Sequence, residues 1–257
     1  MTNTNNKNHL SSVRNALRML KSFSMDEPEK SVSELAESLD INKSTVSRTM
    51  ATLASEGFVY KDPDTNKYRL GLSIISLSGI INNNTDIFNE SQPVLNRLVE
   101  SCGETAHISV LDNDEIIYLQ KVECNHPVRI LTHVGKRNPA YCTSAGKVLL
   151  AFSDDDVVER VIAKGLKKFT KHTITSPTKL REHLQEIRLN GYAHSLEEFN
   201  EGVSSIATPI FDYTGKVVSA LSVVAPKQRL NNRKLKEITK KTINASKAIS
   251  ERLGYWR

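Results

Sequence analysis

The chain of 257 residues contains only three cysteines and one tryptophan, and it has no apolar run long enough to cross a membrane. The cysteines, at positions 102, 124 and 142, are odd in number and far apart, which argues against a disulfide framework and against zinc motifs built from paired cysteines. The longest nearly apolar stretch, residues 217–225, has about half the length of a membrane span. Residues 1–9 are polar and lack an apolar signal core, so we expect a disordered tail on a cytoplasmic protein with no membrane partner.

The composition that remains is that of an ordinary globular protein. Hydrophobic residues make up 39% of the chain and charged residues 25%, which supplies a core and argues against wholesale disorder. The net charge is +6, and residues 226–257 carry ten basic and two acidic side chains. A basic balance fits a nucleic-acid partner, although global charge alone is weak evidence. The length indicates one large domain or two modest ones.

The first 70 residues predict a helix, a short helix, a tight turn, a third helix and a hairpin. Ser31 and Glu34 form a capping-box pair at the start of the second helix. The third helix is expected over residues 43–56, and two short strands over 58–60 and 68–70. The first helix has apolar residues at one-turn spacing, which predicts a single buried face: Val13, Ala16, Leu17 and Leu20. This order of elements is that of a winged helix-turn-helix.

The third helix has a face suited to DNA. Residues 41–55 contain no acidic side chain, and the outward side of the helix has small polar residues and one arginine. Small polar side chains let a helix approach base edges, and an arginine can pair with guanine or contact a phosphate. The hairpin tip offers further polar and basic groups to the DNA backbone or the minor groove. The alternative is a solvated helix face in a small helical module. The predicted DNA-binding residues are Lys43, Ser44, Thr45, Ser47, Arg48, Thr52, Asn66, Lys67 and Arg69.

A strongly apolar helical stretch, residues 72–81, follows the hairpin. A small winged helix-turn-helix domain has little room to bury this stretch. We therefore expect the stretch to pack against a second copy or to link two domains, with a domain boundary near residue 80. From residue 104 the apolar period changes from helical to two, which predicts an α+β domain with a mostly antiparallel sheet. Its strands are expected at residues 105–111, 115–122, 128–134, 192–194, 204–211 and 217–224.

Several segments together resemble one known family: ALRMLKSF (16–23), INKSTVSRTMATLASEGFV (41–59), DPDTNKYRLG (62–71), NPAYCTSAGKVLLA (138–151), GYAHSLEEFNEGVSSIATPIFD (191–212) and SALSVVAP (219–226). The chain resembles the IclR family of bacterial transcription regulators, and residues 135–152 are most similar to the branch that contains the pectin-degradation regulator KdgR. The resemblance implies a winged helix-turn-helix domain over 10–72, a linker helix over 73–86 and a GAF-like effector-binding domain over 87–257. Members of this family work as homodimers or homotetramers.

A candidate effector site begins at residues 143–147, which open a helix. The free N–H groups and the positive end of a helix dipole favour a carboxylate there. The resemblance implies that the backbone of Ser144 and Ala145 binds the carboxylate, and that polar and wall residues from elsewhere complete the pocket: Ile130, Asn138, Ser195, Ser205 and Ser222. A polar residue at the wall position Asn138 indicates a more hydroxylated ligand. The alternative is that these serines are ordinary sheet residues bonded to backbone.

Two near matches to enzyme motifs occur at the same helix start. Ser144 and Lys147 have the Ser-x-x-Lys spacing of penicillin-binding enzymes, but the partner Lys-Thr-Gly is absent from the chain. Gly146-Lys147 lacks the other residues of a phosphate-binding P-loop, since positions 141 and 148 are tyrosine and valine. We expect Lys147 to neutralise a bound acid or to pair with a carboxylate. The seven histidines show no metal-ligand spacing, so we predict neither a metal nor a cofactor.

The sequence therefore predicts a ligand-responsive, DNA-binding transcription regulator rather than an enzyme. We expect a repressor of a catabolic operon that binds double-stranded DNA at a near-palindromic operator and senses a small carboxylate or sugar acid. The alternative function is a metabolite-binding enzyme whose winged helix mediates protein contacts.

Overall fold

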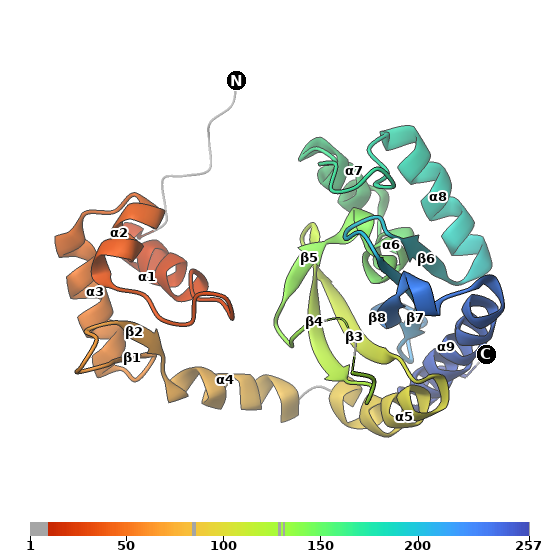
Figure 1. Ribbon diagram of the computed structural model, residues 1–257, viewed down its shortest axis with the longest axis horizontal. Helices are drawn as coiled ribbons and strands as arrows, with labels where there is room; N and C mark the ends of the chain where they lie inside the picture. Colours follow the sequence, from red (N-terminus) through yellow and green to blue (C-terminus); the bar gives the residue numbers. More distant parts are fainter. Residues whose placement is uncertain (1–9, 84–85, 128–129, 131, 257) are drawn as a thin grey trace. The chain divides into compact units, whose positions relative to one another are not determined.

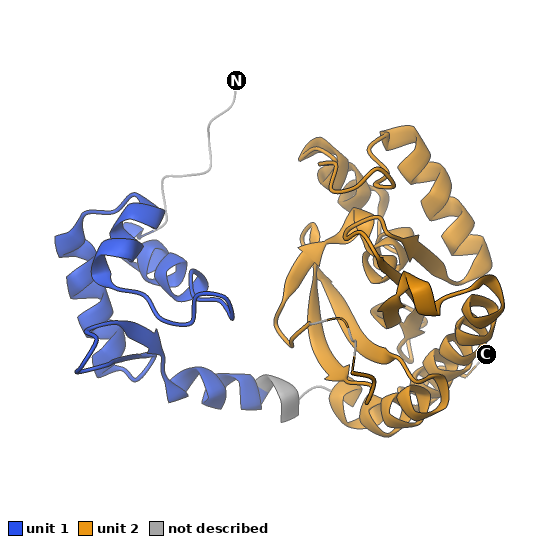
Figure 2. Cartoon of the chain, viewed as in Figure 1, with its two compact units in different colours: residues 1–84 blue, residues 85–257 orange. Residues whose placement is uncertain are grey.

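The computed structural model describes residues 10–83, 86–127, 130 and 132–256, and the tail predicted for residues 1–9 lies outside this range (Figure 1). The chain divides into two compact units, residues 1–84 and residues 85–257 (Figure 2). Each unit has its own buried core, so each is described by itself. None of the described helices is long and apolar enough to span a bilayer.

The first unit contains helices and one hairpin in the order that the sequence predicts. Its elements are α1 (Ser11–Lys21), α2 (Val32–Leu39), α3 (Lys43–Ser55), β1 (Val59–Lys61), β2 (Tyr68–Leu70) and α4 (Leu72–Asn83). The capping box at the start of α2 is confirmed, because the Ser31 side chain accepts from the Glu34 N–H and the Glu34 carboxylate accepts from the Ser31 N–H. Asp40 adopts a left-handed conformation after α2, which makes the turn into α3 tight.

The core of the first unit lies among α1, α2 and α3. Met19, Leu35 and Val46 are fully buried in it. The prediction that Val13 and Leu17 face this core is wrong, because each is 52% exposed. The long, flexible side chain of Met19, which the spacing argument passed over, enters the core instead, and a methionine fills irregular space well.

The two short strands that the sequence predicts form an antiparallel hairpin, in which Val59 pairs with Leu70. Gly71 follows β2 directly, and a Cβ atom at this position would lie 2.1 Å from the backbone oxygen of Gly57. Only glycine fits so close a backbone approach, which joins the end of α3 to the start of α4.

The second unit is built on a six-stranded antiparallel sheet in the order β5-β4-β3-β8-β7-β6. The strands are β3 (Thr105–Asp112), β4 (Glu115–Val122), β5 (Arg137–Pro139), β6 (Ala193–Leu196), β7 (Val203–Phe211) and β8 (Val217–Pro226). The helices are α5 (Asp86–Cys102), α6 (Ser144–Ala151), α7 (Asp155–Ala163), α8 (Pro177–Asn190) and α9 (Asn232–Arg252), with short 3-10 helices η1 (Ala140–Cys142) and η2 (Lys227–Arg229).

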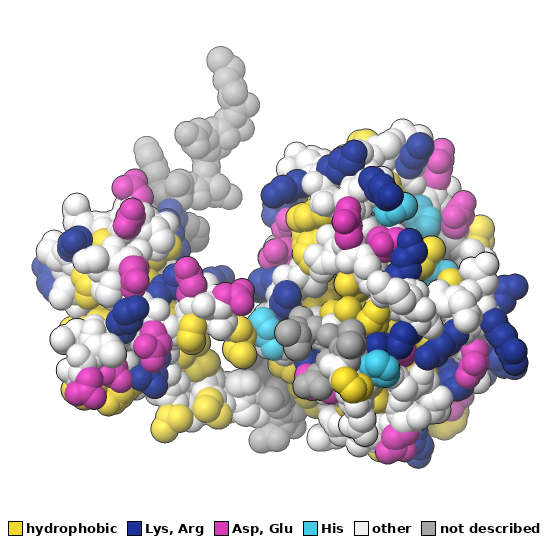
Figure 3. Space-filling view, viewed as in Figure 1, with side chains coloured by type: hydrophobic (Ala, Val, Ile, Leu, Met, Phe, Trp, Pro, Cys, Tyr) yellow, Lys and Arg dark blue, Asp and Glu magenta, His cyan; other side chains and the backbone are white. Residues whose placement is uncertain are grey.

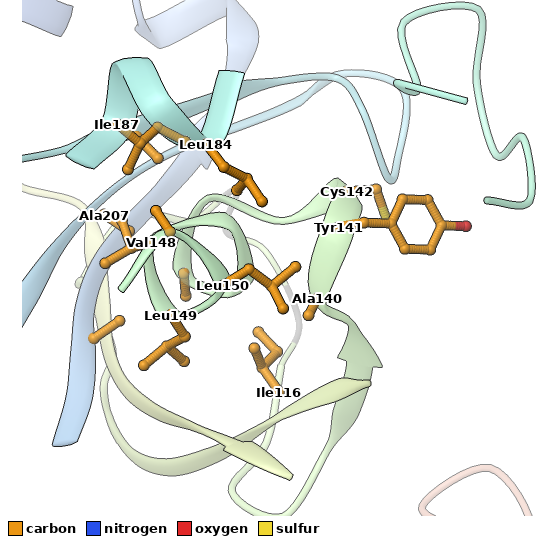
Figure 4. Close-up of a cluster of buried hydrophobic side chains, with 14 of the residues drawn as sticks. Ile116, Ala140, Tyr141, Cys142, Val148, Leu149, Leu150, Leu184, Ile187 and Ala207 are labelled. Atoms are coloured by element: carbon orange, nitrogen blue, oxygen red, sulfur yellow. The ribbon is translucent and has the colours of Figure 1, made fainter. Parts of the chain in front are cut away.

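Helices cover both faces of this sheet. α5 and α9 pack together against one face, where strand residues such as Ile108 and Leu221 are fully buried. α6 packs across the other face, and α8 packs against α6; Ile116, Leu150 and Leu184 belong to this second cluster (Figure 4). The short helix α6 is thus fixed on both sides, which holds its N-terminal end at a defined place over the sheet.

One predicted strand is wrong. The described residues of the stretch 128–134 form no strand, and the edge strand is β5, which pairs with β4 through Glu115 and Pro139. A turn at Gly135, with φ +83°, separates the stretch from β5. Ile130, one of the apolar residues whose alternation suggested a strand, lines a cavity instead.

Candidate DNA-binding helix and effector cavity

Helix α3 has one buried side and one exposed side. Val46 and Met50 are fully buried against the core of the first unit. On the opposite side, the predicted DNA-binding residue Thr45 is half-buried and the other five are exposed. The exposed residues are Lys43, Ser44, Ser47, Arg48 and Thr52. Asn42 precedes α3, and its side chain makes no capping hydrogen bond. The N–H groups of Lys43 and Ser44 are left for an outside acceptor such as a phosphate oxygen, whereas the Thr45 N–H bonds to the Asn42 carbonyl at 2.9 Å.

The hairpin tip is less basic than its sequence suggests. The Arg69 guanidinium lies 2.7 Å from an Asp62 carboxylate oxygen and 3.0 Å from a Glu29 carboxylate oxygen. Lys67 Nζ lies 3.8 Å from Glu34 Oε1. Asn66 is exposed in a left-handed conformation at the turn. The structure thus places Asn66 and Lys67 at the tip and Arg69 on β2, and Lys67 and Arg69 have carboxylate neighbours that reduce their local charge.

All the predicted effector residues line one cavity of about 70 Å³ in the second unit. It lies at the N-terminal end of α6, and the predicted residues come from six separate segments: Ile130, Asn138, Ser144, Ala145, Ser195, Ser205 and Ser222. The remaining lining residues are His107, Tyr118, Thr132, Lys136, Cys142, Thr143, Phe199, Asn200, Val203 and Val224. None of these described lining residues is acidic, so the cavity suits an anion.

The register of the sheet explains why distant serines meet. Ser195 lies opposite Ser205, and Ser205 lies opposite Val224. On the next row of the same face, Ser222 lies opposite His107. Residues directly opposite on neighbouring strands share one face of a sheet, so these side chains all face the cavity.

The helix start at α6 has the features of an anion site. The Thr143 side chain caps the helix by accepting from the Gly146 N–H at 3.2 Å. The N–H groups of Ser144 and Ala145, by contrast, have no acceptor among the described residues. Gly146 allows the helix to start here, because a Cβ atom on it would lie 2.2 Å from the Ala140 oxygen.

Serine hydroxyls hold this end of the cavity together. Ser144 Oγ donates to Ser205 Oγ at 2.7 Å, which ties α6 to β7. Ser195 Oγ donates to the Cys142 carbonyl at 3.1 Å. The nearby Cys142 is a thiol at neutral pH, because burial raises its pKa to about 12. Three of the predicted serines thus bond within the protein, and the bond between Ser144 and Ser205 lies beside the free N–H groups.

The β3 and β4 side of the cavity carries polar groups that were not among the predicted ligand contacts. His107 Nε2 lies 2.6 Å from Thr132 Oγ1, and Asn138 Nδ2 donates to the Tyr118 hydroxyl at 3.1 Å. The strand pattern could have revealed His107 and Tyr118, since period two puts them on the cavity face. Phe199 and the residues after it come from the turn between β6 and β7, where no periodicity gives a signal.

Lys147 follows directly after the helix start, but it is not among the cavity-lining residues. It is fully buried, and its ammonium lies 2.5 Å from Glu198 Oε1, 2.8 Å from the His194 carbonyl and 3.1 Å from His183 Nε2. Of the two roles expected for Lys147, pairing with a carboxylate is therefore confirmed. Among the described residues no group of three or more His, Cys, Asp or Glu side chains is placed to hold a metal.

Residues 12–63 match the IclR helix-turn-helix domain, and residues 81–251 match the C-terminal domain of the bacterial transcriptional regulator IclR. The chain belongs to the IclR family. It is a DNA-binding transcriptional regulator with an N-terminal helix-turn-helix domain and a C-terminal effector-binding domain. The alternative reading, an enzyme whose winged helix mediates protein contacts, is wrong, because the matching families and relatives are regulators.

Similar proteins include regulators from several bacteria. The chain is 34% identical over 248 residues to the transcriptional regulator KdgR of Escherichia coli, covering 96% of this chain and 94% of KdgR, in agreement with the KdgR-like branch. It is 31% identical over 225 residues to the transcriptional repressor AllR of Salmonella typhimurium, covering 87% and 83% of the two chains. The crystal structure of an IclR homolog from Microbacterium hydrocarbonoxydans, complexed with 4-hydroxybenzoate, aligns with a TM-score of 0.84 and 25% identity over 95% of this chain and 99% of the homolog.

Proposed function

We propose that this IclR-family protein is a repressor of a catabolic operon, and that a small carboxylate or sugar acid bound in the cavity changes its affinity for DNA. The observation that carries the proposal is the convergence of the predicted effector residues on one cavity at the N-terminal end of α6. This cavity has two free helix N–H groups, several hydroxyls and no described acidic residue in its lining. Such a site stabilises a carboxylate through the helix dipole and direct hydrogen bonds.

On the DNA side, we propose that α3 enters the major groove. Ser44 and Ser47 are small enough for close approach to base edges, and Arg48 reaches either a guanine or a phosphate. Lys43, Thr45 and Thr52 would flank these contacts. Asn66, Lys67 and Arg69 on the hairpin would contact the neighbouring DNA backbone, with the carboxylate partners of Lys67 and Arg69 limiting the strength of that contact.

The proposed assembly is a homodimer or homotetramer on a near-palindromic operator. None of the described side chains of α4 is buried, although this helix is mostly apolar (Figure 3). Four of its large hydrophobic side chains are 50–78% exposed: Leu72, Ile75, Leu77 and Ile80. An apolar helix face of this kind gains stability by packing against a second copy. A two-fold dimer presents two copies of α3 to two half-sites, which matches a palindrome.

The repressor role rests on likeness to relatives, of which AllR is named a repressor. A ligand releases DNA only if it binds the DNA-free arrangement more tightly than the DNA-bound one. The proposal therefore predicts that the effector lowers affinity for the operator in proportion to its occupancy of the cavity.

The test is a thermal-shift screen of the purified full-length protein against small acids. The panel spans 2-oxo acids, sugar acids such as 2-keto-3-deoxygluconate, and aromatic carboxylates including 4-hydroxybenzoate. A ligand that binds only the folded state raises the midpoint in a concentration-dependent way. Each hit is then added to the protein–operator complex in a fluorescence anisotropy titration, where release of DNA supports a repressor. A panel without hits would refute the carboxylate assignment while leaving the DNA-binding family assignment intact.

A further inference from the structure

The effector cavity spans several strands of the sheet. Ser205, which bonds to Ser144 at the helix start, lies on β7, whereas His107 lies on β3. The strand order places β8 between β7 and β3, so the two strands are separated by roughly 10 Å. The start of α6 and His107 line the same cavity, so an acid held by its carboxylate at the helix start can present another group to His107.

His107 has one nitrogen in use and one without a partner. The residue is 1% exposed, and its Nε2 atom lies 2.6 Å from Thr132 Oγ1. Its Nδ1 atom is buried and has no hydrogen-bond partner in the part of the chain that the structure describes. Buried polar atoms are nearly always paired, and an unpaired one costs free energy. A buried ring nitrogen on a residue that lines a ligand cavity is therefore a position that a ligand can satisfy.

The imidazole of His107 is neutral. Burial, reinforced by the nearby Lys121 ammonium, lowers its pKa to about 3. A neutral imidazole carries one N–H and one acceptor nitrogen, so Nδ1 can form a single hydrogen bond with an uncharged group such as a hydroxyl. It has no charge with which to pair a second carboxylate.

Tyr118 and Asn138, on the same side of the cavity as His107, are polar and uncharged, whereas Lys121 near His107 and the cavity-lining Lys136 are basic. The ring of Tyr118 has its centroid 4.6 Å from that of His107, and the Tyr118 hydroxyl accepts from Asn138 at 3.1 Å. All three residues line the cavity. His107, Tyr118 and Asn138 thus offer hydrogen bonds to neutral oxygen atoms on this side of the cavity.

We propose that His107 determines effector specificity by hydrogen bonding, through Nδ1, to a hydroxyl group that the effector carries on the part of its chain remote from the carboxylate. This inference rests on the proposed function, because it places the carboxylate at the start of α6. It narrows the effector class to acids that carry a hydroxyl group remote from the carboxylate. Acids without such a hydroxyl group satisfy only the helix start.

The test uses two variants that place an amide at different positions of the former ring. In His107→Asn the amide lies near the position of Nδ1, whereas in His107→Gln it lies near that of Nε2 and can keep the contact with Thr132. Isothermal titration calorimetry of the full-length protein is run with four probes: gluconate, 2-keto-3-deoxygluconate, hexanoate and pyruvate. We expect the wild type to favour a hydroxylated acid over hexanoate. His107→Gln should lose roughly tenfold or more of that affinity, and His107→Asn should keep most of it.

Pyruvate affinity reports on the carboxylate end alone and should be the same in all three proteins. Hydroxylated acids that bind equally well to the wild type and to His107→Gln would overturn the role of His107 while leaving the carboxylate site standing. Tighter binding of hexanoate or pyruvate than of either hydroxylated acid would overturn the effector class. If none of the four acids binds, both this inference and the proposed carboxylate site fail. The thermal midpoint of each variant, measured without ligand, checks that it is folded.

Discussion

Lys147 Nζ lies 2.5 Å from Glu198 Oε1, and this ion pair joins α6 to the turn between β6 and β7. The Lys147 side chain is fully buried and that of Glu198 is 10% exposed. The turn that holds Glu198 also supplies Phe199 and Asn200 to the cavity wall. The pair therefore connects the helix that would bind the carboxylate to the segment beside it.

Breaking this pair should destabilise the second unit. Lys147→Met leaves the Glu198 carboxylate buried without its cation, and breaking a buried pair costs about 3–5 kcal/mol. The measurement is the free energy of unfolding from urea titrations. Lys164→Met serves as the matched control, because Lys164 pairs with Asp114 at the surface with 61% of its side chain exposed, and should change the free energy by less than about 1 kcal/mol. Equal losses in the two variants would contradict the importance of the buried pair.

Stability should fall between pH 6.5 and pH 5 because of His107. Its pKa is about 3 in the folded protein and near 6.5 in an unfolded chain, so in this window the unfolded state binds a proton that the folded state does not. The folded state therefore loses up to about 2 kcal/mol by pH 5 from this residue, and regains it as the pH rises. Urea titrations at pH 6.5 and at pH 5 give the free energy of unfolding, which should fall less between these two pH values in His107→Gln than in the wild type. A slope identical to that of the wild type would show that His107 does not have the lowered pKa.

Arg48→Ala should weaken specific DNA binding by about 1–3 kcal/mol if Arg48 reads a base. The loss should be smaller on unrelated DNA, since a base contact contributes only at the correct sequence. Fluorescence anisotropy with an operator duplex and a scrambled duplex measures both affinities. Arg181→Ala, which removes an exposed arginine paired with Glu159 in the second unit, is the control and should bind DNA like the wild type. Unchanged affinity in Arg48→Ala would remove Arg48 from the interface.

Ser205→Ala should weaken effector binding by about 1 kcal/mol or more and leave DNA binding without effector unchanged. The substitution removes the acceptor of the Ser144 hydroxyl at the helix start. Ser204→Ala is a close control, because Ser204 precedes Ser205 on β7 and its buried side chain points to the other face of the sheet. Calorimetry with a hit from the acid screen should distinguish the two variants, and similar ligand affinities would exclude Ser205 from the site.

Gly146→Ala should distort the start of α6. The new methyl group would lie 2.2 Å from the Ala140 oxygen, so backbone must move, and such overpacking costs about 1–3 kcal/mol. Gly79→Ala tests the same change where no atom lies within 4 Å of the added Cβ, inside helix α4. That control should keep or slightly raise the thermal midpoint, because alanine favours a helix. A Gly146→Ala protein with unchanged midpoint and effector affinity would show that the helix start tolerates movement.

Local patterns in the sequence were sufficient for much of the first unit. The capping box at Ser31 and Glu34, the exposed face of α3 and the β1–β2 hairpin depend on residues a few positions apart, whose contacts the backbone period determines. The same reasoning failed for α1, where Val13 and Leu17 fit the spacing as well as Met19 does. Spacing defines the faces of a helix but not which neighbour each face meets.

The sequence by itself determined the two-part organisation, the family and the residues at the start of α6. Only the tertiary structure decided that Lys147 pairs with Glu198, which is 51 positions away, and that Thr132 lies beside His107. It also decided that β5, and not the stretch before it, forms the edge of the sheet. The physical reason is the distance along the chain over which each interaction acts. Caps, turns and periodicities are set by neighbouring residues, whereas the cavity and its buried pairs form only when the strand order and helix packing bring distant segments together.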